Sequence, residues 1–348
     1  MSHMANYWSK KGWSVTLITL ASRAGDFYPL EREVARVALD VSGSSSGLLE
    51  AIFRNMRRVW ALRSAIRRSE PDAVVSFMDS VNIITLLATR FTRIPVVVAE
   101  RTDPREHRIA TMWDRLRNWL YPQADAVVVQ THNGMQWAQS IVKATQVHVI
   151  PNSVDSCPCG QAGNKPEFSK PFILAVGRLG KEKGFDLLLQ AFQDIYLEHP
   201  EWSLVILGEG AGRGDLEALA DSLGLGPRVH LPGLHANPAS VMRQAEIFVL
   251  SSRYEGFPNV LLEAMACQIA VVSFDCHSGP REIIRHNVDG VLVPPADAKA
   301  LAAALRDLIM DEGKRKSLAG NASQVTERFG VNRVMGMWEK TLMDIKRS

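Results

Sequence analysis

Residues 251–265 read SSRYEGFPNVLLEAM and follow a short apolar run at residues 247–250. A strand, a glycine-containing loop and a helix start therefore come in direct succession, and Pro258 suits the first helical position because its fixed φ fits there. Glu255 lies in the loop. Glu263 lies in a helix that is apolar on all sides, which predicts that it is buried and needs a partner. This strand–loop–helix unit is typical of a parallel α/β sheet.

The loop and the helix start also form a candidate anion site. Gly256 lets the backbone approach a ligand closely, and the free amides that follow it can hold a phosphate at the positive end of the helix dipole. Glu255 would lie over that site. Each acid alone has a plainer interpretation, with Glu263 paired to a core arginine and Glu255 solvated. The combination with the glycine and the helix start favours a sugar-nucleotide site.

Short apolar runs alternate with helical patterns along the chain, which predicts parallel sheets built from βαβ units. Strands are expected at residues 14–20, 73–77, 95–99, 126–130 and 147–150, and again at 172–176, 203–207, 228–231, 247–250, 270–274 and 290–293. Residues 151–171 are rich in Pro, Gly, Ser and Asn and have no periodicity, so they indicate a boundary. We expect doubly wound domains over 1–155 and 171–330, a linker over 156–170, and a C-terminal helix over 331–348 that packs on the first domain. Such sheets bind ligands at the carboxyl ends of their strands, so the expected site is the cleft between the domains.

The composition is that of an ordinary globular protein of 348 residues. No apolar run reaches the ~18 to 20 residues of a membrane span, and no signal peptide opens the chain. We therefore expect a cytoplasmic protein, and the basic first half leaves peripheral attachment at the inner face of the membrane open. The four cysteines, Cys157, Cys159, Cys267 and Cys276, show no metal-ligand spacing and are interpreted as reduced and incidental.

The net charge of +3 hides an asymmetry, because residues 1–150 carry 19 Lys and Arg against 13 Asp and Glu. Much of this charge lies on a predicted helix at residues 48–68. One face of it holds Leu49, Ile52, Phe53, Met56, Val59 and Trp60, and the opposite face holds Arg54, Arg57, Arg58 and Arg68. A second basic helix is expected to hold Arg105, Arg108, Arg115 and Arg117 with aromatic residues between them. These faces are either solvated or meet anionic lipid, and no recognition motif points to nucleic acid.

Further glycine turns follow the other strands of the second half. Residues 177–184 read GRLGKEKG and place Arg178 and Lys183 at the carboxyl edge of a strand, where they can clamp a diphosphate. Gly208 follows the next strand, and residues 278–283 repeat the pattern after another. There Arg281 or Glu282 could face the cleft, although a structural turn is the simpler interpretation.

In the first half, Glu100, Arg101 and Asp103 follow an apolar strand and are candidates for contacts with a second substrate. His107 and His132 are weaker candidates, because neither has a visible partner.

The start of the chain departs from the usual order of a doubly wound domain. Residues 5–12 read as the last turns of a helix that ends at Gly12 and leads into a strand. A first strand with a tight glycine-rich turn normally comes before that helix. We therefore expect the first sheet to lack its central strand and to leave two neighbouring strands with unpaired edges, an aggregation hazard.

On these residues the chain resembles the retaining glycosyltransferases of the GT-B fold, family four of the carbohydrate-enzyme classification, over nearly its whole length. The densest match runs from residues 237–238 through 248–260 to Met265 and looks like the Glu-x7-Glu signature. Residues 151–155 (PNSVD) are similar to the segment that ends the first domain. Residues 266–270 (ACQIA) depart from the Ala-Cys-Gly that related sequences often have, which we interpret as a structural variant.

The resemblance implies a nucleotide-sugar site. Arg178 and Lys183 would hold the donor diphosphate, Glu263 the ribose hydroxyls and Glu255 the hydroxyls of the donor sugar. The implied catalytic residues are Glu255, Arg178 and Lys183. The implied donor-binding residues are these three with Gly177, Gly208, Gly256, Phe257, Pro258, Asn259, Val260 and Glu263.

The expected function is a retaining transferase that moves a hexose or N-acetylhexosamine from a nucleotide sugar, with UDP the expected carrier. The expected acceptor is a glycan or lipid-linked molecule in surface polysaccharide or oligosaccharide assembly, because residues 274–284 are similar to such enzymes. No metal or cofactor is expected, since the chain contains no Asp-x-Asp and two cations serve the diphosphate. Two alternatives stay open: a sugar-nucleotide epimerase or hydrolase of the same fold, and a module that binds nucleotide but is inactive.

Overall fold

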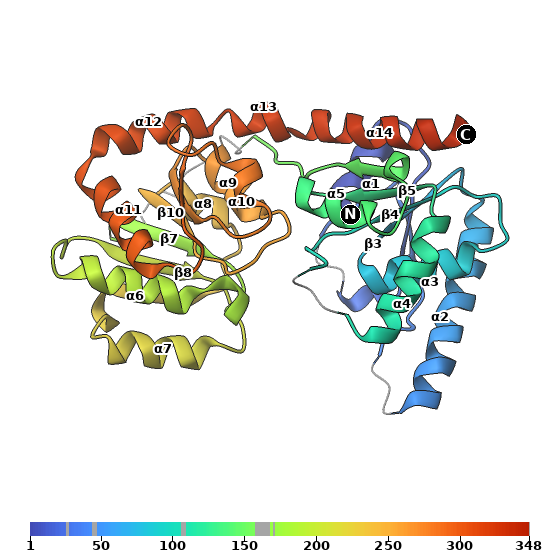
Figure 1. Cartoon of the computed structure of the whole chain (residues 1–348), viewed down its shortest axis with the longest axis horizontal. Coiled ribbons are helices and arrows are strands. Elements are labelled where there is room, and N and C mark those ends of the chain that lie inside the picture. Colours follow the sequence, from blue (N-terminus) through green and yellow to red (C-terminus); the bar gives the residue numbers. More distant parts are fainter. Residues whose placement is uncertain (26–27, 44–46, 106–108, 157–167, 170, 348) are drawn as a thin grey trace.

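The computed structural model describes residues 1–25, 28–43, 47–105, 109–156, 168–169 and 171–347. In these ranges the strands form three sheets, all parallel, and helices cover them (Figure 1). Apolar runs such as residues 172–176 become strands because both faces of a parallel sheet are buried by helices. The expected α/β class is confirmed.

The second domain holds a six-stranded sheet in the order β12-β11-β10-β7-β8-β9. Its strands are β7 (Phe172–Val176), β8 (Ser203–Leu207), β9 (Val229–Gly233), β10 (Ile247–Leu250), β11 (Ala270–Phe274) and β12 (Val291–Val293). Four of the six have the bounds that the apolar runs predict. β9 extends two residues further, because its ladder with β8 is irregular and resumes at Gly233.

Helices pack on both faces of this sheet. They are α6 (Phe185–Tyr196), α7 (Arg213–Ser222), α8 (Pro238–Met242), α9 (Asn259–Ala266), α10 (Pro280–Ile283), α11 (Ala298–Met310), α12 (Glu312–Ala322) and α13 (Val325–Phe329), with short 3-10 turns at Lys181–Lys183 and Gly226–Arg228. Alternate strand residues face opposite cores. Ile173 packs with α6 and α11, whereas Phe172 and Leu174 pack with α8 and α9.

The first domain contains two sheets, β1-β2 and β3-β4-β5-β6. The strands are β1 (Thr16–Thr19), β2 (Ala35–Ala38), β3 (Val74–Phe77), β4 (Val96–Ala99), β5 (Ala126–Val129) and β6 (Val147–Val149). The helices are α1 (Ser2–Lys10), α2 (Leu48–Ser69), α3 (Asp79–Thr89), α4 (Thr111–Leu120) and α5 (His132–Gln139), with 3-10 turns at Arg23–Gly25, Tyr121–Gln123 and Ala144–Gln146. Sequence analysis missed β2, a run of four residues that includes an arginine.

β1 and β3 are edge strands, because β1 pairs only with β2 and β3 only with β4 in the described part of the chain. Residues of both strands nevertheless enter the same apolar cluster under α2 and α3, through Ile18 and Val74. The residues of β4 and β5 are fully buried, whereas those of β1 are all partly exposed. The expected pair of unpaired strand edges is present.

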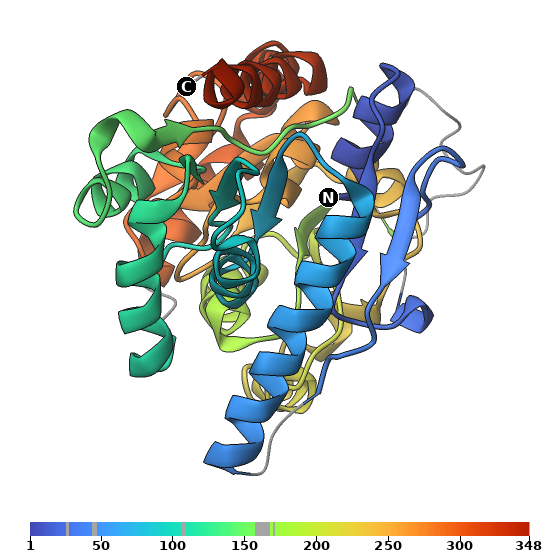
Figure 2. The same cartoon turned by 90° about the vertical axis from the view of Figure 1, so that its right-hand side faces the viewer.

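The last helix, α14 (Val331–Arg347), crosses from the second domain and lies along the first (Figures 1 and 2). Trp338 is buried there in a cluster with Trp8 of α1 and Val97 of β4. Two ion pairs, Lys11 with Glu339 in the middle of the helix and Lys346 with Asp72 near its C-terminal end, each measure 2.9 Å between nitrogen and oxygen. The first domain is therefore built from the N-terminal part of the chain together with the C-terminal helix α14.

Candidate functional site

The two loops that carry the expected donor residues lie side by side. β7 and β10 are neighbours in the sheet, yet their crossovers run to opposite sides, so the strand order reverses between them. The loops that follow them are tied together, since Ser251 Oγ donates to the carbonyl of Lys183 at 2.9 Å and the N–H of Arg253 donates to the carbonyl of Glu182 at 2.8 Å. Such a reversal point at the carboxyl ends of the strands is where open α/β sheets bind ligands.

Lys183 and Glu255 face each other across these loops. Lys183 Nζ donates to Glu255 Oε1 at 2.6 Å, and Ser252 Oγ donates to the same oxygen at 2.7 Å. The two side chains are 20% and 11% exposed, so the pair is only partly open to water. Glu255 is therefore an oriented carboxylate, not the solvated loop acid of the plainer interpretation.

Arg178 is the most open cation of the site. Its side chain is 77% exposed, and its Nε lies 3.7 Å from Glu182. An exposed pair of this length contributes only about 0–1 kcal/mol, so the guanidinium can turn toward a ligand at little cost.

Gly177 and Gly208 lie where the loops after β7 and β8 contact each other. Gly208 has a φ of +146°, and a Cβ there would lie 1.8 Å from the carbonyl oxygen of Gly177. The N–H of Gly177 donates to the carbonyl of Leu207 at 2.9 Å, which brings the loops after β7 and β8 into contact. Gly208 therefore has a structural reason to be a glycine, whereas a Cβ on Gly177 would meet only side-chain atoms of Lys183 and Phe185 at 3.4 Å.

α9 begins one residue later than expected. Pro258 is its N-cap, with φ −72° and ψ 104°, and Asn259 is its first residue. The N–H groups of Asn259 and Val260 have no hydrogen-bond partner within the described ranges. These two amides, at the positive end of the helix dipole, remain available to an anion. Phe257 is buried and packs edge-on against Phe329.

The prediction that Glu263 is buried with a partner is wrong. Its side chain is exposed, and within the described residues its carboxylate has no hydrogen bond or ion pair. The reason is helical spacing: Asn259 and Glu263 are four residues apart and share the one face of α9 that leaves the core. Although the carboxylate reaches solvent, the surrounding protein desolvates it enough to raise its pKa above the usual value.

The backbone that approaches Gly256 belongs to the first domain. A Cβ on Gly256 would lie 2.6 Å from the carbonyl oxygen of Arg101 and 3.1 Å from the Cα of Thr102. A ligand was expected to approach the backbone closely at Gly256, and in the structure the backbone of the first domain makes that approach. Gly256 is thus a contact point between the two domains, at the entrance to α9.

Asn152, in the segment that leaves β6, bridges the same junction. Its Oδ1 accepts from Arg101 Nη1 at 2.6 Å, and its Nδ2 donates to Asn259 Oδ1 at 2.6 Å and to the carbonyl of Phe257 at 3.2 Å. Sequence analysis did not single out Asn152, because its partners lie 51 and 107 positions away.

Arg101 itself lies inside the first domain. Its guanidinium stacks over the rings of Phe77 and Trp338, at 4.6 and 5.7 Å from the ring centroids. Burial lowers its pKa to about 10. The buried side chain therefore fixes the position of Asn152 through their hydrogen bond.

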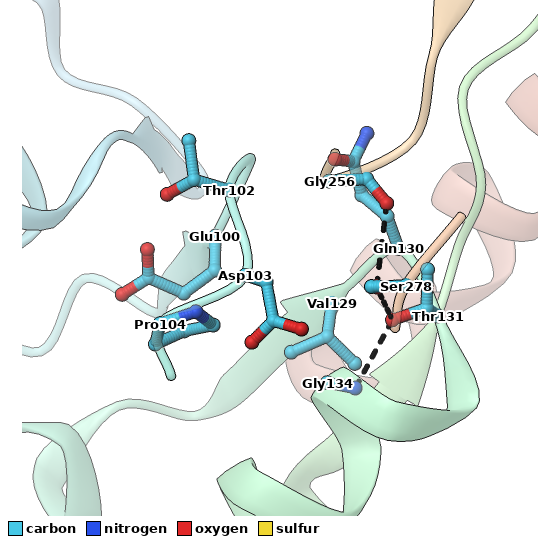
Figure 3. A pocket seen from close by; sticks show the side chains of 10 residues that line it. All are labelled: Glu100, Thr102, Asp103, Pro104, Val129, Gln130, Thr131, Gly134, Gly256 and Ser278. Atoms are coloured by element: carbon cyan, nitrogen blue, oxygen red, sulfur yellow. Dashed lines mark hydrogen bonds between the residues drawn. The ribbon is translucent and has the colours of Figure 1, made fainter. Parts of the chain in front are cut away.

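Glu100 belongs to a buried polar cluster. Tyr121 Oη donates to its carboxylate, and Asn82 Nδ2 donates to Tyr121 Oη at 3.1 Å. Desolvation raises the pKa of Glu100 to about 7, against the opposing effects of Tyr121 and Arg117. Figure 3 shows its carboxylate pointing away from the second-domain residues.

Asp103 lines a small pocket at the seam between the domains, opposite Gly256 and Ser278 (Figure 3). It is 6% exposed; its Oδ1 accepts from the N–H of Arg105 at 3.0 Å, and its Oδ2 has no partner among the described residues. Thr131 closes the pocket, since it shares a hydrogen bond of 3.1 Å with Ser278.

The start of α5 meets α10 across the seam. Glu282 accepts from the N–H of His132 at 2.6 Å and contacts its Nδ1 at 2.9 Å, and Asn133 donates to the carbonyl of His277. The expectation that His132 lacks a partner is therefore wrong. Glu282 faces the first domain, whereas Arg281 pairs with Asp275 at 2.6 Å. His107 lies outside the described residues.

Comparison with known proteins places this geometry in a family. A family model described as "Glycosyl transferase 4-like domain" matches residues 1–153, and one described as "Glycosyl transferases group 1" matches residues 162–325. A Campylobacter jejuni protein named N-acetylgalactosamine-N,N'-diacetylbacillosaminyl-diphospho-undecaprenol 4-alpha-N-acetylgalactosaminyltransferase is 31% identical over 267 residues, which cover 74% of this chain and 72% of the relative. The chain belongs to the group 1 glycosyltransferases.

Further comparisons agree with this assignment. A second Campylobacter jejuni protein, GalNAc-alpha-(1->4)-GalNAc-alpha-(1->3)-diNAcBac-PP-undecaprenol alpha-1,4-N-acetyl-D-galactosaminyltransferase, is 29% identical over 92% of this chain and 88% of its own length. HepE from Anabaena, solved in complex with UDP, superposes with a TM-score of 0.75 at 20% identity, covering 90% of this chain and 87% of that one. The two Rossmann-like domains of this glycosyltransferase therefore form a GT-B fold.

Neither a metal centre nor a membrane span is found in the described part of this glycosyltransferase. No group of three or more His, Cys, Asp or Glu side chains gathers there in a way that could hold a metal ion. No helix in those ranges has the length and apolarity needed to cross a membrane. Cys267 and Cys276 are free thiols, and Cys157 and Cys159 lie outside the described residues.

Proposed function

We propose that this group 1 glycosyltransferase is a retaining enzyme that transfers a hexose or N-acetylhexosamine from a UDP-sugar to a glycan or lipid-linked acceptor, in the assembly of surface polysaccharide or oligosaccharide. The observation that carries the proposal is the set of groups around the reversal point between β7 and β10. It combines an exposed guanidinium, an ammonium, and two amides and a carboxylate that have no partner in the described part of the chain. This combination suits a nucleoside diphosphate.

On the donor side, Arg178 and Lys183 bind the diphosphate together with the N–H groups of Asn259 and Val260. In the free protein Lys183 is held by Glu255 at 2.6 Å. A diphosphate would draw the ammonium partly away and leave Glu255 free to accept hydrogen bonds from the hydroxyls of the donor sugar. Glu263 binds the ribose hydroxyls, since it is a carboxylate with open acceptor positions one helical turn beyond Asn259.

The reaction breaks the bond between the anomeric carbon and the diphosphate, and negative charge develops on the leaving oxygen. Fixed cations and amides stabilise that charge, and loss of one such group costs on the order of 10²-fold or more in rate. The departing phosphate takes the proton of the acceptor hydroxyl on the same face of the sugar, which gives retention. Arg178 and Lys183 supply the positive charge, so we propose that transfer needs no divalent metal.

On the acceptor side, the three candidates take different roles in the proposal. Asp103 accepts a hydrogen bond from the hydroxyl group of the acceptor, because its Oδ2 lies in the seam pocket without a partner among the described residues. Arg101 positions Asn152 and through it the start of α9. Glu100 supports the strand end from the buried cluster with Tyr121.

The nature of the substrates is supported by the similar proteins. Both Campylobacter jejuni relatives are named for transfer to undecaprenol-linked saccharides, and HepE was solved with UDP. We therefore propose a UDP-sugar as donor and a polyprenyl-linked saccharide as the first acceptor to test.

A turnover panel tests this function. The protein is incubated with UDP- and GDP-sugars, each with and without an undecaprenyl-diphosphate saccharide, in buffer that contains EDTA. We expect a product only with a UDP-sugar and acceptor together, and NMR of the new linkage should show the anomeric configuration of the donor. An inverted linkage, a strict need for metal, or a preference for GDP-sugars would contradict the proposal. Product from donor alone would indicate the epimerase or hydrolase instead.

A further inference from the structure

We propose that the exposed face of α2, with the turn after α3 and the end of α4, forms a docking surface for an anionic lipid bilayer. Four large apolar side chains of α2 point into solvent: Ile52, Phe53, Met56 and Trp60 are 47%, 73%, 65% and 78% exposed. Soluble monomers rarely leave such a contiguous apolar stripe uncovered.

The stripe is separate from the face that attaches α2 to the domain. Leu62 and Ile66 are buried in the cluster with Ile84 of α3, and Val59 packs against the same cluster. The exposed residues follow the three- and four-residue spacing of a second helix face. Figure 1 shows the N-terminal end of α2 extending past the other helices of the first domain, and Figure 2 shows α2 running along the near side.

A second aromatic group continues this surface. Phe91, in the turn after α3, is 88% exposed, and Trp119 near the end of α4 is 50% exposed. The guanidinium of Arg90 lies 5.1 Å from the ring centroid of Phe91 and 4.7 Å from that of Trp119. Arg63 of α2 donates to the carbonyl of Arg90 at 3.2 Å, which joins this group to the helix.

The backbone at Phe91 supports a role for its exposed ring. Its φ is +64°, a left-handed conformation that is uncommon for a residue with a bulky side chain. Such a conformation persists only where the surroundings hold it. Here it presents an aromatic ring to solvent at the rim of the stripe.

Charge complementarity selects an anionic bilayer as the occupant. Residues 51–69 contain six arginines and no acidic residue, and Arg57 and Arg67 are exposed. Asp114 of α4 is paired with Arg117 at 2.5 Å. Cations around an apolar, aromatic face are typical of helices that lie in the lipid headgroup region. A second copy of this chain would bring the same positive charge against it.

The surface differs from the basic face that the sequence predicted on α2. Arg54 pairs with Glu50 at 2.6 Å, and Arg58 donates to the carbonyls of Val41 and Gly43. Arg58 thus holds the segment before α2, whereas the pair of Arg54 lies within the helix. Of the apolar face expected opposite these two arginines, Ile52, Phe53, Met56 and Trp60 are left uncovered, Val59 packs on the domain, and the side chain of Leu49 lies outside the described part.

The inference rests on the proposed function in one respect: docking on the bilayer would bring the cleft to a lipid-linked acceptor. Its test needs neither donor nor acceptor. Binding of the full chain to vesicles of phosphatidylglycerol and phosphatidylcholine is measured by co-sedimentation at low salt, with pure phosphatidylcholine as reference. The apolar variant is Phe53→Ser with Trp60→Ser, and the charge variant is Arg57→Glu with Arg67→Glu.

We expect each double variant to bind anionic vesicles at least about tenfold more weakly than the wild type. The matched controls are Leu197→Ser with Leu234→Ser, two residues of the second domain that are 83% and 81% exposed, and Lys299→Glu with Lys316→Glu. Both controls should bind like the wild type. Quenching of tryptophan fluorescence by brominated lipid should fall in Trp60→Phe if that ring enters the bilayer.

Three results would overturn the inference. The first is a wild type that does not bind anionic vesicles at low salt. The second is an equal loss of binding in the test and control variants. The third is a dimer in sedimentation equilibrium that Phe53→Ser with Trp60→Ser converts to a monomer, which would assign the stripe to a second copy. Transfer to a water-soluble acceptor remains a separate measurement of the proposed function.

Discussion

At the scale of single residues, the ionisation of Glu100 is coupled to folding. Desolvation raises its pKa from 4.5 to about 7. Because the folded state binds this proton more tightly than the unfolded chain, the stabilisation is fully present below the unfolded pKa. It is lost as the pH rises from about 4.5 through about 7.

Replacing Glu100 by Gln removes this titration while keeping an oxygen that accepts from Tyr121. Between pH 5 and pH 8 the free energy of unfolding of the wild type should fall relative to the variant, by up to roughly 3 kcal/mol. Urea denaturation at both pH values measures the difference. Glu33→Gln, at an exposed carboxylate, serves as control. Parallel pH profiles for wild type and Glu100→Gln would show that this assignment of the proton is wrong.

Glu255 and Glu263 show what residue spacing can and cannot predict. Their separation pointed to the candidate site, but the expected burial of Glu263 was wrong: it is exposed, whereas Glu255 is held by Lys183 and Ser252. The sequence around Glu263 is apolar in every direction, so periodicity alone does not reveal which side of an eight-residue helix leaves the core. That side depends on the neighbouring elements.

At the scale of elements, the second sheet was predictable because its inner strands are continuous apolar runs. β7, β8, β10 and β11 have the bounds that those runs indicate. β2 was not predicted, since Ala35–Ala38 is short, contains Arg36 and is buried only in part. The loops of the site followed from the strands, because glycine turns at the carboxyl ends of parallel strands meet at one edge.

The open edges of β1 and β3 predict uneven protection of the backbone in the first domain. Amides of β1 and β3 should exchange with solvent faster than those of β4 and β5, because open-edge strands lose their hydrogen bonds without breaking a second ladder. Hydrogen exchange followed by mass spectrometry measures this strand by strand. β7 and β8, inner strands of the other sheet, provide the protected reference. Equal protection of β1 and β4 would contradict the topology described for this domain.

At the scale of the whole molecule, the junction between the domains was the least predictable part. Arg101 and Thr102 contact Gly256 through their backbone. Asn152 donates a hydrogen bond to Asn259, and Glu282 accepts one from the first N–H of α5. The contacts join residues more than 100 positions apart and depend on how two separately folded sheets face each other. Neither periodicity nor local spacing carries that information. As a result, the neighbouring loops of the proposed donor half could be predicted from the sequence, whereas their contacts with the first domain could not.

The same arrangement makes nucleotide binding the property on which the proposed function depends. Arg178 lies in the loop after β7 and Glu263 in α9, and neither has a strong partner within the described residues. If both contact UDP, removing either should cost a charge-assisted hydrogen bond, which is about 1.5–3 kcal/mol.

Calorimetric titration with UDP is therefore the most direct measurement. We predict that Arg178→Ala and Glu263→Gln each raise the Kd by about tenfold or more. Arg306→Ala should leave it unchanged, because Arg306 pairs with Glu198 just beyond the C-terminal end of α6, away from the loops of the site. If Arg178→Ala and Glu263→Gln both bind UDP with the Kd of the wild type, that result contradicts a UDP site between β7 and β10.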